Sequence, residues 1–222
     1  MLRNIQFYFV DRNKDVVDTY GSVFRDLKNV TVHRGNILSQ KADCIVSPGN
    51  SYGCMDGGVD KAINYTLNYI SKDIKEIINN FYMGEQPIGT CLLIRVLEEN
   101  YNGYKYLAHT PTMRVPEDVS QNDNAYIAFR ALLVKLVKHN VMCIKQNKNE
   151  SLIKSVVLTS FCTGAGNMDK MVSAKQMRLA FDLVNSPLES NWKNANWINS
   201  KIKQMLKHWY VFIYILIFLS HS

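Results

Sequence analysis

The sequence lacks the cysteine patterns that mark disulfide frameworks and zinc sites. Its five cysteines are an odd number, and no two of them form a Cys-x-x-Cys pair. The first residues, Met-Leu-Arg-Asn-Ile-Gln, lack the long apolar stretch of a secretory signal. Free thiols without such a signal are typical of a reducing compartment. We therefore expect an intracellular, cytoplasmic protein, and we expect no metal site and no cofactor.

A compact stripe of arginines is absent too. Lys and Arg number 26 against 19 Asp and Glu, which gives a net charge of +7. A positive balance favours anionic partners such as nucleotides, phosphates, nucleic acids or acidic membrane surfaces. The basic residues are nevertheless dispersed, with loose groups at 135–154 and 193–207. The sequence therefore predicts no specific nucleic-acid partner.

No apolar run is long enough to cross a membrane as a helix. The run at 209–219 has eleven apolar residues after Lys201, Lys203 and Lys207, whereas a spanning helix needs about 20. Exposed to water, such a run would favour aggregation. We expect a final buried strand or an extension, packed against the domain or against a second copy. A membrane-surface anchor with basic flanks is the less favoured alternative.

Hydrophobic patterning predicts a chain in which strands alternate with helices. Apolar runs predict six strands, at 5–10, 30–33, 42–47, 90–96, 104–109 and 155–160. Apolar residues at helical spacing predict helices over 16–27, 63–81, 125–139 and 172–184. Cys44, Ile45 and Val46 are apolar in succession, which indicates a strand buried on both faces. The fold class is therefore α/β, a three-layer α/β/α sandwich with a mixed, mostly parallel central sheet.

Three loops follow predicted strands, which is where open α/β sheets place their ligands. Residues 35–38, Gly-Asn-Ile-Leu, are by composition an ordinary turn. Residues 47–60 lead into a helix, whose N-terminus favours negative charge, and Gly57 and Gly58 let a phosphate or ribose approach the backbone. Residues 163–167, Thr-Gly-Ala-Gly-Asn, can cradle a pyrophosphate with backbone amides.

The third loop has two familiar rivals, and both fail. A dinucleotide-binding fingerprint needs three glycines, but Gly164 and Gly166 are followed by Asp169 where the third belongs. No further βαβ unit follows it either. A Walker loop is excluded because no Gly-Lys-Ser/Thr follows.

Three further residues carry groups that can react or bind a phosphate. His109 ends a strand, and we interpret it as a hydrogen-bonded structural histidine rather than a catalytic base. Arg114 either clamps a phosphate or forms a surface ion pair. Cys162 has no base near it in sequence, so we interpret it as a packed thiol.

The ordered set of loops resembles the macro domain family. Macro domains carry a Gly-Asp-Ile-Thr turn, a strand ending in Asn-Ala-Ala-Asn, then Gly-Gly-Gly-Val-Asp before a helix, and later a Gly-Thr-Gly-Ile-type loop. This chain has counterparts at 35–38, 47–50, 56–60 and 162–165, in the same order and strand context. The resemblance covers roughly residues 5–185. It implies a macro domain over 1–190 and a C-terminal extension with an apolar tail over 191–222.

The amino-acid sequences of two segments resemble one branch of that family. Ser-Pro-Gly-Asn-Ser-Tyr-Gly at 47–53 and Pro-Thr-Met-Arg-Val-Pro at 111–116 look most like viral, phage and microbial members. Some of these are assigned as ADP-ribose 1″-phosphate phosphatases. Three positions depart from the family pattern: Asn36 replaces an Asp, Ser47 replaces the first Asn, and Asp56 replaces the first Gly.

The resemblance implies a set of site residues. Asn36 would face the adenine with Ile37 flanking it, and Asn50 would bind the distal ribose. Asn50 and Asp60 would be the catalytic residues, with Asp60 near the scissile bond. The substrate-binding residues would be Asn36, Ile37, Asn50, Gly57, Gly58, Val59, Thr163, Gly164, Ala165, Gly166 and Asn167.

Two functions of different classes follow from this resemblance. The first is an enzyme that hydrolyses an ADP-ribose derivative, as an ADP-ribose 1″-phosphate phosphatase or a mono-ADP-ribosyl hydrolase. The alternative is a non-catalytic reader that binds ADP-ribose or an ADP-ribosylated protein. A third, weaker option is another nucleotide or an RNA end, which the positive charge would tolerate.

Overall fold

A six-stranded mixed sheet forms the centre of the molecule. The computed structural model describes residues 2–97 and 102–219, with side chains described up to residue 207. The strand order is β2-β1-β6-β3-β5-β4. All neighbouring pairs are parallel except β4 with β5, which is antiparallel. The strands are β1 (Gln6–Asp11), β2 (Val30–Arg34), β3 (Cys44–Ser47), β4 (Leu92–Arg95), β5 (Tyr106–His109) and β6 (Ser155–Leu158).

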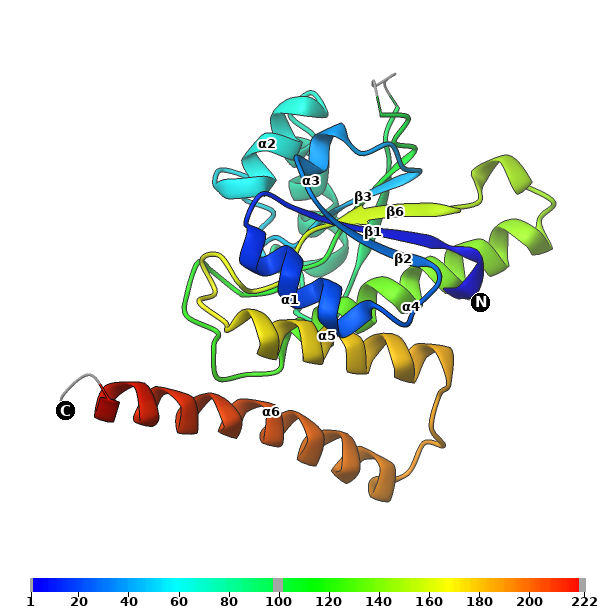
Figure 1. Cartoon of the computed structure of the whole chain (residues 1–222). Coiled ribbons are helices and arrows are strands. Elements are labelled where there is room, and N and C mark those ends of the chain that lie inside the picture. Colours follow the sequence, from blue (N-terminus) through cyan, green and yellow to red (C-terminus); the bar gives the residue numbers. More distant parts are fainter. Residues whose placement is uncertain (1, 98–101, 220–222) are drawn as a thin grey trace.

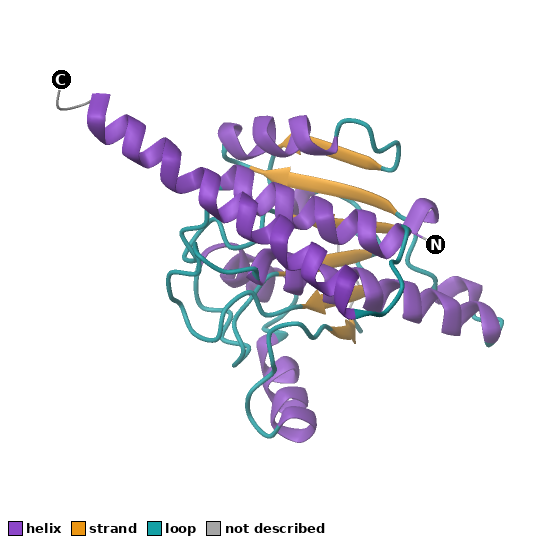
Figure 2. Cartoon of the chain, turned by 90° about the horizontal axis from the view of Figure 1, so that it is seen from below, coloured by secondary structure: helices purple, strands orange, loops and turns teal. Residues whose placement is uncertain are grey.

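Helices cover both faces of the sheet, as Figures 1 and 2 show. The α-helices are α1 (Lys14–Phe24), α2 (Gly58–Thr66), α3 (Ser71–Tyr82), α4 (Asn124–Lys145), α5 (Lys170–Asn185) and α6 (Trp192–Leu219). Short 3-10 helices are η1 (Leu2–Asn4), η2 (Ile37–Ser39) and η3 (Asn149–Ser151). The predicted three-layer α/β/α sandwich is confirmed.

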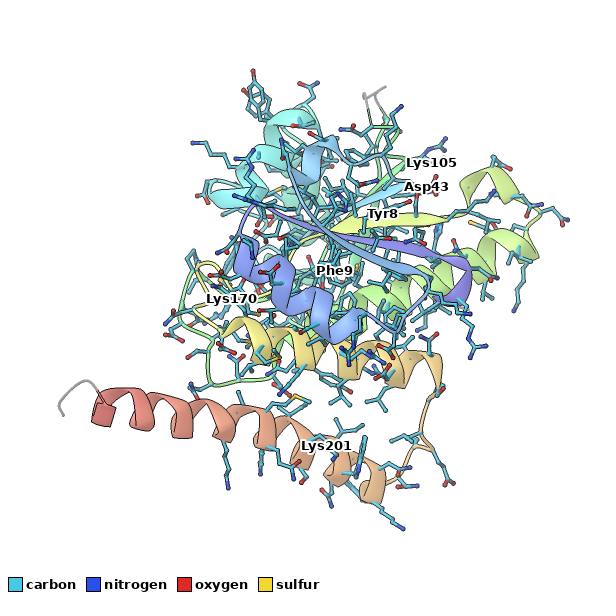
Figure 3. All side chains as sticks on the ribbon, in the orientation of Figure 1. Tyr8, Phe9, Asp43, Lys105, Lys170 and Lys201 are labelled. Atoms are coloured by element: carbon cyan, nitrogen blue, oxygen red, sulfur yellow. The ribbon has the colours of Figure 1, made fainter. Side chains whose placement is uncertain are left out.

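Two hydrophobic cores explain the layers. One core joins the sheet to α1, α4 and α5, and the other joins the opposite face to α2 and α3. Because side chains alternate along a strand, Phe9 of β1 enters the first core while its neighbour Tyr8 packs against the second (Figure 3). All four residues of β3 are buried, which confirms the prediction of a strand covered on both faces.

The predicted helix over residues 63–81 is two helices. The chain leaves α2 after Thr66, and Asn68 and Tyr69 adopt positive φ angles of 51° and 62° before α3 begins. The side chain of Asn64 stabilises this corner because its Oδ1 accepts a hydrogen bond from the backbone N–H of Ser71 at 3.0 Å. The corner keeps Ile74 in the core but leaves Phe81, at 76% exposure, in solvent.

The C-terminal segment is a helix, so the expectation of a final strand is wrong. α6 packs on α5, and its far end extends past the body of the domain in both views (Figures 1 and 2). Ile202 is buried, and Ile198 and Leu206 pack against the same core. The expected burial of residues 209–219 concerns side chains outside the described part of the structure. Among the described residues, no helix meets the length and apolarity that a membrane span requires.

Candidate functional site

A cavity of about 550 Å³ opens at the edge of the sheet where β1, β3, β5 and β6 end. Parallel strands present their carboxyl ends at one edge, so the loops that follow them converge there. The lining comes from the segments 11–16, 48–60, 112–116 and 159–170. Two of the three loops singled out in the sequence, after β3 and after β6, therefore meet across one cavity.

The loops after β3 and β5 are fastened to each other. The backbone N–H of Thr112 donates to the carbonyl of Gly49 at 2.9 Å, and Asn50 forms a β-bridge with Met113. The side chain of Asn124, at the start of α4, donates to the carbonyl of Thr112 at 2.8 Å. One wall of the cavity is thus held in place before any ligand binds.

The loop after β6 presents unused hydrogen-bond donors. Within the described chain, the backbone N–H groups of residues 163–166 have no hydrogen-bond acceptor. Gly166 packs closely against the backbone of its own loop, because a Cβ at this position would lie 2.6 Å from the carbonyl oxygen of Cys162. Successive free N–H groups on a fixed turn form a concave site for an anion.

The N-terminus of α2 is uncapped. Its first internal hydrogen bond runs from the N–H of Lys61 to the carbonyl of Gly57, so the N–H groups of Gly58, Val59 and Asp60 have no acceptor within the helix. Gly57 is the N-cap residue and has no side chain to accept from them. An anion in the cavity can take that place.

Two more helices begin at the same cavity. Asn13, the N-cap of α1, and Lys170, the first residue of α5, both line it. Because each helix N-terminus carries a partial positive charge, three of them raise the potential where an anionic ligand would lie. Lys170 also brings an ammonium group to the cavity (Figure 3), and its Nζ is paired with Oδ2 of Asp15 at 3.1 Å.

Asp60 is one of three acidic residues that line the cavity, with Asp11 and Asp56. Its Oδ1 accepts a hydrogen bond from Oγ of Ser47, the last residue of β3, at 2.8 Å. Burial raises the pKa of Asp60 to about 6; the hydrogen bond from Ser47 lowers it, and the nearby charge of Asp56 raises it further. A carboxyl group that titrates near neutral pH can take a proton from water.

A second cavity of about 350 Å³ lies beside the first. The two share Asp11, Gly58, Val59 and Thr159 in their linings. The second is closed on its other side by η2 and the turn before it, at residues 35–37. The remaining loop predicted from the sequence, at residues 35–38, therefore joins the same cleft through this side cavity.

Comparison with known proteins assigns the chain to a family. The family model described as macro-like domain matches residues 17–210. The chain belongs to the macro-like domain family. The recognition of a macro domain from its loops is confirmed, while the narrower resemblance to a viral, phage and microbial branch stays a hypothesis.

Known proteins resemble this macro domain in sequence or in fold, all at low sequence identity. An uncharacterized protein of Aquifex aeolicus (strain VF5) is 27% identical over 150 residues, which cover 67% of this chain and 78% of that protein. The macrodomain of Mycobacterium tuberculosis DarG superposes with a TM-score of 0.54 at 18% identity, covering 69% of this chain and 90% of that one. The Oceanobacillus iheyensis macrodomain with ADP gives a TM-score of 0.51 at 18% identity, covering 78% and 90%. A mutant of that macrodomain with ADPR gives 0.52 at 15% identity, covering 78% and 91%.

Most of the site residues expected from the sequence meet in this macro domain. Asn36 and Ile37 line the second cavity, and Gly58 and Val59 line both. Asn167 lies outside both linings, because its side-chain amide donates to Asp118 at 2.9 Å. Of the expected site residues, those that line the larger cavity are Asn50, Gly57, Gly58, Val59, Asp60, Thr163, Gly164, Ala165 and Gly166.

Asn50 is used mainly to brace its own loop. Its Oδ1 accepts from the N–H groups of Tyr52 and Cys54 at 3.0 and 3.3 Å, and its Nδ2 donates to the carbonyl of Cys54 at 2.9 Å. A carboxamide has two N–H donors, so one is left for a ligand. Asn36 is used in a similar way, since its Oδ1 accepts from the N–H of Leu38.

The sequence interpretation overlooked several lining residues. Asp11 ends β1 and accepts hydrogen bonds from Thr159 and Ser160 on the loop after β6. Lys170 follows Asp169, which caps α5. A polar residue directly after a buried strand was the available signal for Asp11, the same signal that identified the three loops.

The structure gives Arg114, Cys162 and His109 structural roles. Arg114 pairs with Glu85 through two hydrogen bonds of 2.7 and 3.0 Å, so it is an ion pair. Cys162 is buried, which raises the pKa of its thiol to about 12. His109 is fully buried and hydrogen-bonded to Gln86, as the structural interpretation predicts.

Proposed function

We propose that this macro domain binds ADP-ribose or an ADP-ribose derivative in the cleft at the carboxyl edge of its sheet. The observation that carries the proposal is the convergence of unused backbone donors on one cavity: residues 163–166 from one side and the uncapped N-terminus of α2 from the other. Donors arranged in this way suit a pyrophosphate, which has acceptor oxygens on both phosphates. The Oceanobacillus iheyensis macrodomain structures with ADP and with ADPR support the same ligand class.

The two joined cavities suit the two ends of such a ligand. Pockets of about 300–1,000 Å³ hold nucleotide-sized molecules, and both cavities fall in that range. The adenine would enter the smaller cavity beside Asn36 and Ile37. The distal ribose would lie near Asn50 and Asp60 in the larger one.

We propose further that the domain hydrolyses its ligand, with Asp60 as general base. The carboxyl of Asp60 would take a proton from a water molecule, whose oxygen then attacks the ADP-ribose derivative at its distal end. The leaving oxygen takes up a proton from solvent. The bond broken is the phosphate ester of ADP-ribose 1″-phosphate or the ester link to a protein. The pKa of Asp60, about 6, leaves it mostly ionised and ready to accept a proton at pH 7.

A reader without turnover is the alternative, and one observation favours it. Asn50, the second expected catalytic residue, has most of its hydrogen-bonding capacity engaged with Tyr52 and Cys54. Asp60 would then lack a second catalytic residue at the distal ribose. Ligand binding without turnover would be enough to explain the loops.

One experiment separates the two functions. The full chain is incubated with ADP-ribose 1″-phosphate and, in a second tube, with a mono-ADP-ribosylated carrier protein. Released phosphate in the first or free ADP-ribose in the second supports the hydrolase. Binding of ADP-ribose by calorimetry with no product in either tube supports the reader, and the Asp60→Asn variant controls for contaminating activity.

A further inference from the structure

His109 has a fixed tautomer. The ring is fully buried at the end of β5, and its Nδ1 lies 2.8 Å from Oε1 of Gln86. The amide of Gln86 is oriented by its Nε2, which donates to Oγ1 of Thr90 at 3.0 Å and to the carbonyl of His109 at 3.4 Å. Since Oε1 of Gln86 can only accept, Nδ1 must carry the ring proton. Burial lowers the pKa of His109 to about 4, so the ring is neutral at pH 7.

The other ring nitrogen is therefore a bare acceptor. Nε2 of His109 is buried and has no hydrogen-bond donor among the described residues. A buried acceptor without a donor costs free energy, so its presence beside a candidate active site calls for a function.

Gly49 brings this nitrogen beside the reactive carboxyl. A Cβ placed on Gly49 would lie 2.6 Å from Nε2 of His109 and 3.3 Å from Oδ2 of Asp60, so both atoms flank the same point. The other oxygen of Asp60 is occupied by the hydroxyl of Ser47. Oδ2 has no partner among the described residues, and it belongs to a side chain that lines the cavity. Asp60 thus lines the ligand cavity and lies on the same side of Gly49 as the buried histidine.

We propose that His109 is a positioning residue for Asp60, whose carboxyl, when protonated, turns its Oδ2–H toward Nε2 and donates a hydrogen bond to it. No proton moves to the ring. The hydrogen bond exists only when Asp60 carries a proton, so it stabilises the state that forms when Asp60 takes a proton from the attacking water. Its catalytic value rests on the proposed hydrolysis; the hydrogen bond itself does not.

The other charged groups around Asp60 do not replace this contact. Asp56, ahead of α2, favours the protonated carboxyl through charge alone. Asp11, at the end of β1, is engaged with Thr159 and Ser160, and Lys170 of α5 pairs with Asp15. Among the described residues, Nε2 of His109 is the buried side-chain nitrogen or oxygen that has no hydrogen-bond partner.

The proposal can be tested without substrate on the unaltered protein. The carboxyl of Asp60 is titrated by 13C NMR while the 15N signals of His109 are followed over the same pH range. We expect the Nε2 signal to report an unprotonated nitrogen at pH 8 and to shift, with the midpoint of Asp60, as it accepts a hydrogen bond. An Nε2 signal that does not move while Asp60 titrates overturns the proposal.

A variant tests the same contact from the other side. His109→Asn keeps a donor for Gln86 and removes the atom at Nε2. We expect the proton affinity of Asp60 to fall by about threefold or more, since a hydrogen bond to the neutral form is lost. His139→Asn is the control, because that ring contacts Ser151 and Cys143 far from Asp60 along the chain. A folded His109→Asn protein with an unchanged Asp60 midpoint contradicts the proposal, and if the variant does not fold, the 15N titration decides.

If the protein turns over substrate, kcat/KM should fall on the acid side with the same midpoint as the titration of Asp60. In His109→Asn, both midpoints should shift together. If it has no turnover, the two titrations still decide whether His109 and Asp60 are coupled. The turnover assay therefore tests the proposed hydrolysis, and the two titrations test the contact between His109 and Asp60 independently of it.

Discussion

Asp60 illustrates how a single residue can be costly to the fold and useful to the site. Its carboxyl is buried beside Ser47, and the pKa of the group rises from 3.8 to about 6. The folded protein holds this proton more tightly than the unfolded chain does. The free energy of unfolding therefore falls as the pH rises between these two values, and the penalty is complete above them.

Asp60→Asn should remove that penalty and keep the hydrogen bond from Ser47, because an amide oxygen still accepts. We expect a melting temperature a few degrees above that of the unaltered protein at pH 8 and a smaller difference at pH 5.5. Differential scanning calorimetry at both pH values checks this. A variant that melts lower at pH 8 would mean that the ionised carboxylate stabilises the fold.

The same substitution should lower turnover by about 10²-fold or more if Asp60 is the general base, while binding of ADP-ribose changes less. In the unaltered protein, activity should fall as the pH drops through about 6, where Asp60 gains its proton. Turnover that survives in Asp60→Asn refutes the assignment of the base.

Among single residues, the sequence could point to those of the candidate site that depend on local chemistry. Gly57, Gly58 and residues 163–166 were found because glycine-rich loops after strands have few other uses. The Gln86–His109 pair could not be found, because 23 residues separate its members and only the folded sheet and its loops bring them together.

At the scale of elements, the order of strands and helices followed from hydrophobic periodicity. The break between α2 and α3 did not, because the apolar spacing of Ile63, Leu67, Ile70 and Ile74 continues across it. The corner is stabilised by a hydrogen bond that the backbone N–H of Ser71, at the start of α3, donates to Oδ1 of Asn64. The helical state of α6 was also missed, since a short apolar run fits a strand and a helix equally well.

The uncapped start of α2 gives a prediction that separates the helix from its ligand. A side chain at Gly57 meets no atom within 4 Å, and its extended backbone suits a capping residue. Gly57→Ser should stabilise the protein relative to Gly57→Ala by about 1 kcal/mol, because serine caps the free N–H groups. It should also bind ADP-ribose more weakly than Gly57→Ala, since the hydroxyl takes the donors that the phosphate needs.

Thermal melting and calorimetric titration of the two variants measure both effects. Because each adds a Cβ, their difference isolates the hydroxyl. Equal affinity in the two variants would show that the N-terminus of α2 does not hold the anion.

At the scale of the whole molecule, the ligand site and the C-terminal helix are separate. The cleft is lined by residues up to Lys170, whereas Ile198, Ile202 and Leu206 of α6 pack against the first core beside α5. We propose that residues 1–190 carry the whole binding site and that α6 adds packing.

A chain ending at residue 190 should therefore bind ADP-ribose within about threefold of the full chain but melt at a lower temperature, because it loses the buried Ile202. A chain ending at Lys207 keeps this packing and serves as the control. Loss of binding in the shorter chain, at a temperature where it is folded, would mean that α6 supports the site directly.

The central claim is that the loop after β6 and the N-terminus of α2 hold a pyrophosphate. Calorimetric titration of the full chain with ADP-ribose tests it most directly, with AMP and the Ala165→Glu variant alongside. We predict a micromolar Kd for ADP-ribose, about −8 kcal/mol, and weaker binding of AMP. Ala165→Glu should not bind ADP-ribose, because the new carboxylate would occupy the exposed loop where the phosphates lie. The melting temperature of this variant should stay unchanged. No heat with ADP-ribose at millimolar concentration, or equal binding by Ala165→Glu, would contradict the account.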